Sequence, residues 1–156
     1  MGRILTLNEA VKWRERLKSE GKTLVFTNGC FDILHVGHTR YLFEARAMGD
    51  ALMVGLNSDA STARLKGEGR PVYPEKERAE ILCSLEAVDA VVIFGEDTPF
   101  SLISAVVPDV LVKGGDWKVD DIVGKDIVLA AGGRVTNISY QEGHSTTGIL
   151  ERIGKG

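Results

Sequence analysis

The chain is poor in cysteine and has no long apolar run. Its two cysteines, Cys30 and Cys83, stand far apart and lack the spacing of metal ligands, so the sequence predicts neither a disulfide framework nor a zinc site. A reduced, cytoplasmic setting is the simplest interpretation. No apolar stretch approaches the roughly 18 residues that a membrane-spanning helix needs, and the N-terminal sequence lacks a signal-peptide core. We therefore expect no membrane association.

The chain also lacks an excess of positive charge. Its formal net charge at pH 7 is −3, and its sequence pI is about 5.6. Proteins that bind duplex nucleic acid normally need a strongly basic surface, so we expect no nucleic-acid partner. A small anionic substrate is compatible with this charge if the cations that bind it are local. The length of 156 residues and the hydrophobic content of 44% predict one globular domain, residues 1–156.

Short apolar runs of strand type alternate with helix-like segments along the chain. Thr6 and Glu9 fit a capping box at the start of the first helix. We expect strands over 22–27, 51–56, 88–94, 110–113 and 134–139, and helices over 7–19, 39–48, 58–65, 74–88, 101–107, 121–131 and 148–154. Such alternation predicts an α/β fold, a Rossmann-like doubly wound sheet of five parallel strands with helices on both faces. The N-terminal helix, within residues 1–21, would pack on this sheet.

The unusual residue clusters of the chain follow the ends of these strands. Ligands of doubly wound folds bind at the carboxyl ends of the strands. Four segments occupy such positions, namely residues 28–38, 57–66, 113–116 and 143–147. We therefore expect these segments to face one crevice.

The segment TNGCFDILHVGH, residues 27–38, links the first apolar strand to a helix and holds His35, Gly37 and His38. The two histidines are three residues apart, which allows three interpretations: a metal-binding pair, a structural pair, or donors to a phosphate. No third histidine or cysteine lies nearby to complete a metal site. A glycine-containing loop before a helix N-terminus suits a phosphate anion. The phosphate interpretation is therefore favoured.

Basic side chains in the other segments are candidate anion ligands. Lys66, in a loop with glycines, is either a phosphate ligand or a solvated lysine, and Arg70 and Arg78 carry the same ambiguity. Lys113 ends an apolar strand and should point into the crevice. Asp116 either binds a hydroxyl or a base, or holds its own loop through an Asx turn.

The hydroxyls of Ser145, Thr146 and Thr147 exceed what capping a helix requires, since one oxygen suffices. The surplus suggests a second phosphate cradle. Asp32 is open to three roles: general base, sugar ligand, or a carboxylate that orders its loop. Cys30 has no paired base in the sequence and is best interpreted as a small packing residue.

Together these segments resemble a known family. Residues 27–38 look like the His-x-Gly-His signature of the nucleotidyltransferase superfamily, which includes the cytidylyltransferases. Five further stretches resemble the D-glycero-β-D-manno-heptose 1-phosphate adenylyltransferases, which make ADP-heptose for lipopolysaccharide cores. These stretches are NSDAS (57–61), RLKGEGRPV (64–72), ERAEIL (77–82), DVLVKGGD (109–116) and STT (145–147). The resemblance extends over residues 22–153. In many bacteria this domain is fused behind a sugar kinase, which acts upstream in the pathway.

The resemblance implies transfer of AMP from ATP to the sugar 1-phosphate, with Mg²⁺ accompanying ATP and no metal ligand supplied by the protein. It implies catalytic roles for His35, His38 and Lys66. The implied nucleotide ligands are Asn28, Gly29, Cys30, Phe31, Gly37, His38, Lys113, Gly114, Asp116, Ser145, Thr146 and Thr147. The implied sugar-phosphate ligands are Asp32, Asn57, Lys66 and Arg78. A homodimer is compatible with the superfamily.

Two other functions stay open at this point. One is a different transferase of the superfamily, such as a glycerol 3-phosphate cytidylyltransferase or another sugar-phosphate adenylyltransferase, because base choice depends on backbone contacts. The other is a nucleotide sensor without catalysis, which the intact basic and hydroxyl residues disfavour.

Overall fold

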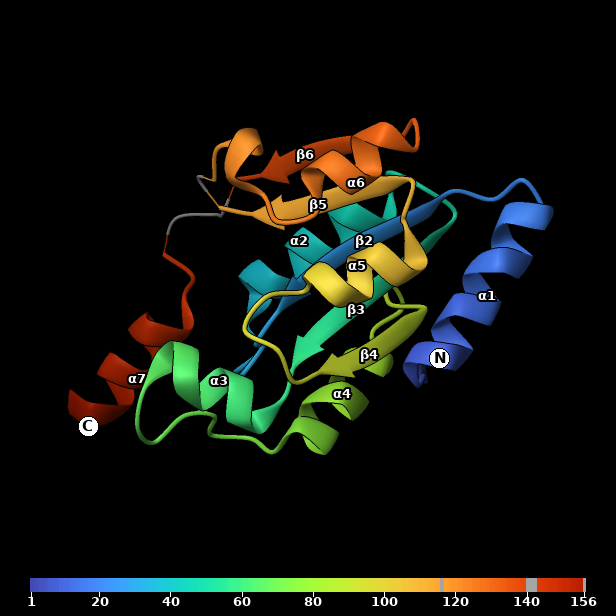
Figure 1. Ribbon diagram of the computed structural model, residues 1–156. Helices are drawn as coiled ribbons and strands as arrows, with labels where there is room; N and C mark the ends of the chain where they lie inside the picture. Colours follow the sequence, from blue (N-terminus) through green and yellow to red (C-terminus); the bar gives the residue numbers. More distant parts are fainter. Residues whose placement is uncertain (116, 140–142, 156) are drawn as a thin grey trace.

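The computed structural model describes residues 1–115, 117–139 and 143–155. Its described residues form one parallel sheet, in the order β1-β4-β3-β2-β5-β6 (Figure 1). The strands are β1 (Arg3–Ile4), β2 (Leu24–Gly29), β3 (Ala51–Asn57), β4 (Ala90–Phe94), β5 (Val110–Gly114) and β6 (Arg134–Ile138). The α/β class, the parallel sheet and all five expected strands are confirmed. The strand count is corrected to six, because the two residues of β1 are too few to carry a strand pattern.

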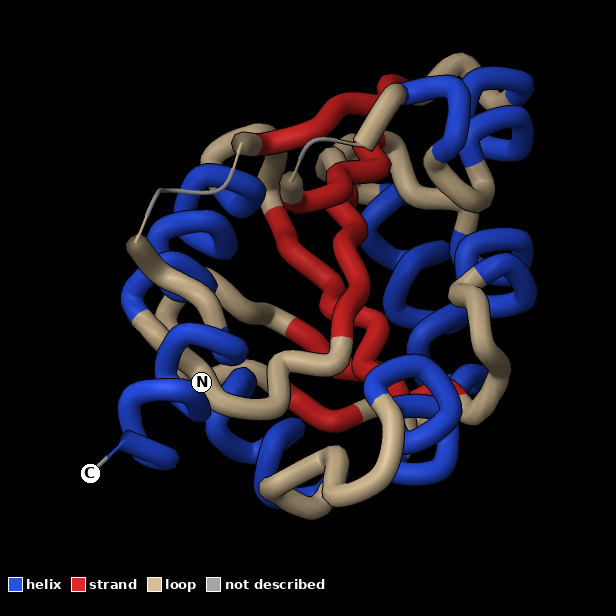
Figure 2. Tube along the Cα trace, turned by 90° about the vertical axis from the view of Figure 1, so that its left-hand side faces the viewer, coloured by secondary structure: helices blue, strands red, loops and turns tan. Residues whose placement is uncertain are grey.

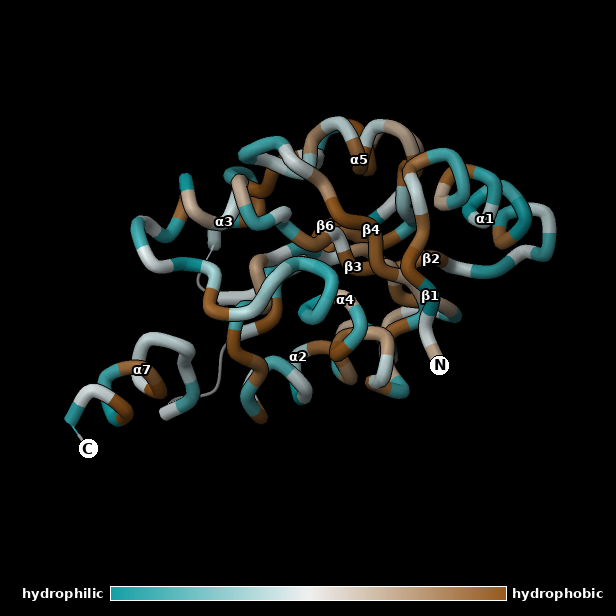
Figure 3. The backbone as a smooth tube through the Cα atoms, turned by 90° about the horizontal axis from the view of Figure 1, so that it is seen from below, coloured by the Kyte–Doolittle hydropathy of each residue, from teal (hydrophilic) through white to brown (hydrophobic). Residues whose placement is uncertain are grey.

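Helices cover both faces of the sheet, as Figures 2 and 3 show from two directions. The helices are α1 (Leu7–Ser19), α2 (Val36–Arg46), α3 (Asp59–Lys66), α4 (Glu75–Cys83), α5 (Phe100–Val106), α6 (Lys125–Ala130) and α7 (Thr146–Lys155), with a 3₁₀ turn, η1 (Val119–Asp121). In Figure 3, α1 and α5 lie on one side of the strands, and α2 and α4 lie on the other. No helix in the described parts of the chain is long and apolar enough to cross a membrane.

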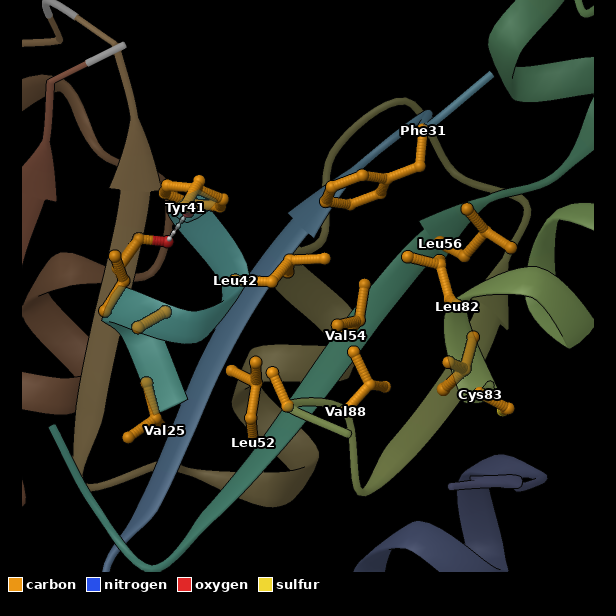
Figure 4. Packing of buried hydrophobic residues seen from close by; sticks show 14 of the residues in the cluster. Val25, Phe31, Tyr41, Leu42, Leu52, Val54, Leu56, Leu82, Cys83 and Val88 are labelled. Atoms are coloured by element: carbon orange, nitrogen blue, oxygen red, sulfur yellow. Dashed lines mark hydrogen bonds between the residues drawn. The ribbon is translucent and has the colours of Figure 1, made fainter. Parts of the chain in front are cut away.

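Two hydrophobic clusters pack against the two faces. Because successive side chains of a strand point to opposite faces, neighbouring β2 residues belong to different clusters. Val25 belongs to one cluster together with Leu42 of α2 and Leu82 of α4 (Figure 4). Phe26 packs with Trp13 of α1 on the opposite face. Burial on both faces explains why these strands are almost continuously apolar.

Helix α1 is fixed at its start and at its middle. The predicted capping box is confirmed, since the Glu9 N–H donates to Thr6 Oγ1 and the Thr6 N–H donates to the Glu9 carboxylate. The guanidinium of Arg14 donates to both carboxylate oxygens of Asp109, at 2.9 and 3.0 Å. Asp109 in turn accepts from the N–H of Leu24, so this pair connects α1 to the start of β2.

The helix expected over 121–131 begins later, at Lys125, because the turn at Gly124 separates η1 from α6. Gly124, between them, has φ +87°, a conformation that ends a helix and favours glycine. A Cβ at this position would lie 2.7 Å from Cγ2 of Ile103. Close packing of α5 against this turn therefore requires the glycine.

The order of the strands determines where the ligand site lies. From β2 the chain proceeds to β3 and β4 on one side, and then it returns to pair β5 with the other side of β2. The point between β2 and β5 is therefore the topological switch point, where doubly wound folds bind their ligands. Residues 30–38 follow β2, and Lys113 and Gly114 end β5, so both flank this point. Figure 1 shows the arrowheads of the strands directed toward the end of the molecule that carries α3 and α7.

Candidate functional site

A cavity of about 670 Å³ opens at the carboxyl ends of the strands. This volume suits a nucleotide-sized ligand. Fourteen of the residues predicted for the site line it: Asn28, Gly29, Cys30, Phe31, Asp32, His35, His38, Asn57, Lys66, Lys113, Gly114, Ser145, Thr146 and Thr147. All four predicted segments thus border one cavity. Asp116 lies outside the described residues, and Gly37 and Arg78 do not line the cavity.

His35 and His38 contact each other at the start of α2. Their rings stack with centroids 3.9 Å apart. Nδ1 of His35 accepts from the N–H of Gly37 (3.1 Å), and Nδ1 of His38 accepts from the N–H of His35 (3.4 Å). These bonds satisfy N–H groups that a helix start leaves unpaired, so α2 begins at Val36, earlier than the predicted residue 39. The histidine pattern is therefore also the cap of the helix.

The same bonds determine where each ring carries its proton. A nitrogen that accepts a hydrogen bond is unprotonated, so the neutral ring carries its hydrogen on Nε2. Burial lowers the pKa of His38 to about 4, with the nearby His35 contributing. Burial, and then the nearby His144, lower the pKa of His35. Both imidazoles are therefore neutral at pH 7, and each offers an Nε2–H donor on the cavity wall.

Two glycines make room for this arrangement. A Cβ at Gly37 would lie 2.9 Å from Cε1 of His35, so only glycine allows the ring to fold back over this position. A Cβ at Gly29 would lie 2.9 Å from Cε2 of Phe31. Phe31, at φ 44°, adopts a left-handed conformation that is rare outside glycine. Its ring packs 5.3 Å from the His38 ring and supports it from beneath.

Lys66 and Lys113 supply positive charge at the cavity. Lys66 is the last residue of α3, and the predicted loop begins only at Gly67, whose φ is +98°. Burial lowers the pKa of Lys113, Cys30 counteracts this shift, and Lys66 adds to it. Among the described residues neither lysine has a carboxylate partner, although Lys113 lies 5.4 Å over the ring of Trp117. Two cations at one cavity that have no counter-ion in the described parts of the chain predict an anionic ligand.

Asp32 anchors the loop that follows Lys66. Its carboxylate accepts from Nε of Arg70 (2.6 Å) and from the backbone N–H groups of Val72 and Tyr73. Burial alone would raise the pKa of Asp32, but these hydrogen bonds outweigh it, and the pKa lies below its usual value. A carboxylate held in this way is a poor general base. Of its three predicted roles, the ordering of a loop fits these contacts best.

Arg78 does not line the cavity, although the resemblance implied a contact with the sugar phosphate. Its side chain is fully buried, and its guanidinium donates to the carbonyls of Tyr73, Cys30 and Asn57 and to the carboxylate of Asp59. These partners belong to the loop after β2, the end of β3, the start of α3 and the loop before α4. Arg78 therefore connects the elements that carry the site without contacting a ligand.

The C-terminal segment closes the remaining side. Ser145 Oγ accepts from the N–H of Gly148 (2.9 Å) and caps α7, and Thr146 Oγ1 donates to the carbonyl of Ile33 (3.3 Å). The hydroxyl of Thr147 has no such bond among the described residues. Of the three hydroxyls, two are thus engaged in local structure.

Several lining residues carried no signal in the sequence. One wall is apolar and is formed by Pro99, Ile122 and Val123. These residues follow β4 and β5, so their position after strands was the only available indication. His144 also lines the cavity, beside His35, and was overlooked because it stands far from the other histidines in the sequence.

Comparison with known proteins agrees with this geometry. A family model described as cytidylyltransferase-like matches residues 26–152. The bifunctional protein HldE of Syntrophotalea carbinolica is 53% identical over 96% of this chain and 32% of its own length. HldE of Geotalea uraniireducens is 58% identical over 89% of this chain and 28% of its own length. The chain thus spans less than a third of the length of these curated relatives.

Solved structures share the fold. The lipopolysaccharide core biosynthesis protein from Thermoplasma volcanium GSS1 has a TM-score of 0.67 at 32% identity, and the match covers 78% of this chain and 100% of that chain. Pantoate-β-alanine ligase from Francisella tularensis, complexed with β-γ ATP and β-alanine, has a TM-score of 0.58 at 13% identity, covering 91% of this chain and 68% of that chain. At that identity the second match shows the fold alone.

Proposed function

The chain belongs to the cytidylyltransferase-like family of nucleotidyltransferases, and we propose that it transfers AMP from ATP to D-glycero-β-D-manno-heptose 1-phosphate, giving ADP-heptose and pyrophosphate. The observation that carries the proposal is the stacked pair of histidines on the cavity wall, with both Nδ1 atoms occupied by backbone N–H groups, which leaves both Nε2–H groups for a ligand. The HldE relatives and the lipopolysaccharide core biosynthesis structure support the choice of sugar.

The reaction needs no nucleophile from the protein. An oxygen of the sugar 1-phosphate attacks the α-phosphorus of ATP in line, the bond to the β-phosphate oxygen breaks, and pyrophosphate leaves. The attacking phosphate is already an anion near neutral pH, so a strong general base is unnecessary. The protein contributes by holding two polyanions in line and by stabilising the charge that develops on the transferred group.

The lining residues supply both positive charge and hydrogen-bond donors for this task. Lys66 and Lys113 bring unpaired positive charge to the cavity, which offsets the repulsion between the two substrates. His35 and His38 supply directed Nε2–H donors for the phosphate that moves. Asp32 and Arg78 keep the surrounding loops in register and contact no substrate in this scheme.

We propose that Mg²⁺ enters as part of the substrate, bound to the phosphate oxygens of ATP. In the described residues no group of three or more His, Cys, Asp or Glu side chains could hold a metal ion. The carboxylate of Asp32 is already engaged by Arg70 and two backbone N–H groups. Oxygen ligands from phosphates and water satisfy this ion, as is common at phosphoryl-transfer sites.

Residues 1–156 act in this scheme as a single transferase domain, with α1 packed on the sheet through Trp13 and Leu17. Cys30 and Cys83 are free thiols, which fits the predicted cytoplasmic setting. A sugar kinase would supply the heptose 1-phosphate. The predicted homodimer is tested by sedimentation velocity.

Pyrophosphate release over a grid of nucleoside triphosphates and sugar or polyol phosphates tests the proposal. We expect release with ATP and heptose 1-phosphate and little with other pairs. Release only with CTP and glycerol 3-phosphate would replace the proposed substrates, and no release with any pair would favour a nucleotide sensor.

Variants then test the roles of the site residues. His35→Ala and His38→Ala should each lower kcat about 100-fold, because removing one well-placed donor typically costs roughly 2.7–4 kcal/mol. Lys66→Ala should raise the KM for ATP, whereas Lys12→Ala, on the exposed face of α1, serves as the matched control and should leave it unchanged. Wild-type turnover in both folded histidine variants would contradict the phosphate role.

A further inference from the structure

His144 is an exposed imidazole on the wall of the cavity, and no motif assigns it a role. The described residues offer it no hydrogen-bond partner and no carboxylate. Of the carboxylates that line the cavity, Asp32 pairs with Arg70 and Asp97 pairs with Arg64. An imidazole left without a partner beside two phosphate donors is available to a ligand.

The backbone brings His144 close to the histidine pair. A Cβ at Gly37 would lie 3.1 Å from Cβ of His144, so this segment lies directly over the first turn of α2. The hydrogen bond from Thr146 to the carbonyl of Ile33 holds the segment there. The glycine that frees space for the His35 ring therefore also admits His144.

The three histidines lie together at one side of the cavity. The same point over Gly37 is 2.9 Å from Cε1 of His35 and 3.1 Å from Cβ of His144, so His144 lies beside the stacked pair, whose centroids are 3.9 Å apart. Three imidazoles on one stretch of the cavity wall suit a chain of linked phosphates better than a single phosphate group.

We propose that His144 binds the phosphate chain of the nucleotide beyond the transferred group, and so holds the pyrophosphate that leaves. This inference rests on the proposed function for the identity of the nucleotide. It assigns the C-terminal segment a direct contact with ligand through a residue outside the Ser-Thr-Thr stretch. His144 is a binding residue for the leaving group, while His35 and His38 act on the phosphate that moves.

Binding of inorganic pyrophosphate and of orthophosphate, measured by titration calorimetry with Mg²⁺ present, tests the proposal. The proteins are the wild type, His144→Ala, His144→Gln and the control Arg152→Ala, which removes an exposed charge from α7 away from the cavity. We expect His144→Ala to weaken pyrophosphate binding about tenfold, as expected for a lost hydrogen bond to a charged group, and to change orthophosphate binding less than about twofold. His144→Gln, which keeps an N–H donor, should recover part of the loss, and Arg152→Ala should match the wild type.

Three results would overturn the inference: equal pyrophosphate affinity in the wild type and His144→Ala, an equal loss for both anions, or an equal loss in Arg152→Ala. The substrate grid separates this failure from failure of the proposed function. If the wild type releases pyrophosphate and His144→Ala keeps its affinity for pyrophosphate, the role of His144 is wrong and the transferase stands. If no pair reacts and the selective tenfold loss is still seen, the phosphate-chain site stands and the transferase is wrong.

Discussion

Replacing Arg78 by methionine distinguishes a residue that holds the site together from one that binds substrate. The wild-type guanidinium is fully buried and donates at 2.7 to 2.9 Å to three backbone carbonyls and one carboxylate. Methionine fills similar space but donates nothing. Cys30, Asn57 and Tyr73 would each lose a donor to their carbonyl, and Asp59 would lose its ion pair.

The loss of free energy of unfolding depends on how far these partners are exposed to solvent. Breaking a buried ion pair by removing one partner typically costs about 3–5 kcal/mol of the free energy of unfolding. The side chain of Asp59 is 44% exposed, so water stabilises its charge once the arginine is gone and the cost falls near the lower limit. We therefore expect a loss of about 3 kcal/mol, which for a chain of this size corresponds to a Tm lower by roughly 6–12 °C.

Urea unfolding measures this loss, with Arg64→Met as the matched control. Arg64 also pairs with an aspartate, Asp97 at 2.7 Å, but both side chains are at least half exposed, so its removal should cost about 0–1 kcal/mol. At temperatures below its Tm, the Arg78→Met variant should have a lower kcat, because the loops that Arg78 binds would be displaced. It should keep most of its nucleotide affinity. A variant with unchanged stability and a large loss of sugar-phosphate affinity would refute this reasoning and restore the direct contact.

Three further perturbations have outcomes that the geometry determines. The pKa of His38 in the folded protein is about 4, below its ordinary 6.5, so the unfolded chain takes up the proton first as the pH falls. The free energy of unfolding should therefore be highest above pH 6.5 and should decline toward pH 4, by up to about 3 kcal/mol. Urea unfolding of His38→Gln should show a smaller decline. Gly37→Ala should lower kcat, because the added Cβ would lie 2.9 Å from the His35 ring and 3.1 Å from Cβ of His144 and would displace both; an unchanged kcat would contradict the need for glycine. Lys113→Met should raise the free energy of unfolding, since burial already disfavours the charge, and should weaken ATP binding; a lower stability in thermal unfolding would count against an unpaired cation.

The sequence predicted those parts of the fold that repeat along the chain. Alternating strands and helices specify a parallel sheet, and chemistry at strand ends collects at one edge of it. The break at Gly124 was not predictable, because it depends on contact with Ile103 of the preceding helix α5, which the local sequence does not show. Strand β1 was missed because it has only two residues, and these are identified as a strand by their pairing with β4.

The roles of individual side chains in the site were harder to predict than its location. Arg78 and Lys113 are both basic residues in motif segments, yet one is saturated by protein carbonyls and the other faces a cavity. That difference depends on which acceptors the folded backbone presents, and nothing in the local sequence states it. For the same reason Asp32 reads as a candidate base in the sequence but is bound by Arg70 and two N–H groups in the structure.

The neutrality of the two histidines has a physical advantage in a site that must also release its product. In the proposed reaction Lys66 and Lys113 already offset the charge of the substrates, and two further permanent cations would raise affinity for the ground state and for pyrophosphate as well. Neutral Nε2–H donors, held in place by backbone N–H groups at their Nδ1 atoms, gain strength only where negative charge increases. Burial keeps the pKa of His38 low enough that this state persists throughout the physiological range. The backbone bonds that cap α2 therefore also set the tautomer, so the same contacts that begin the helix prepare the site for phosphoryl transfer.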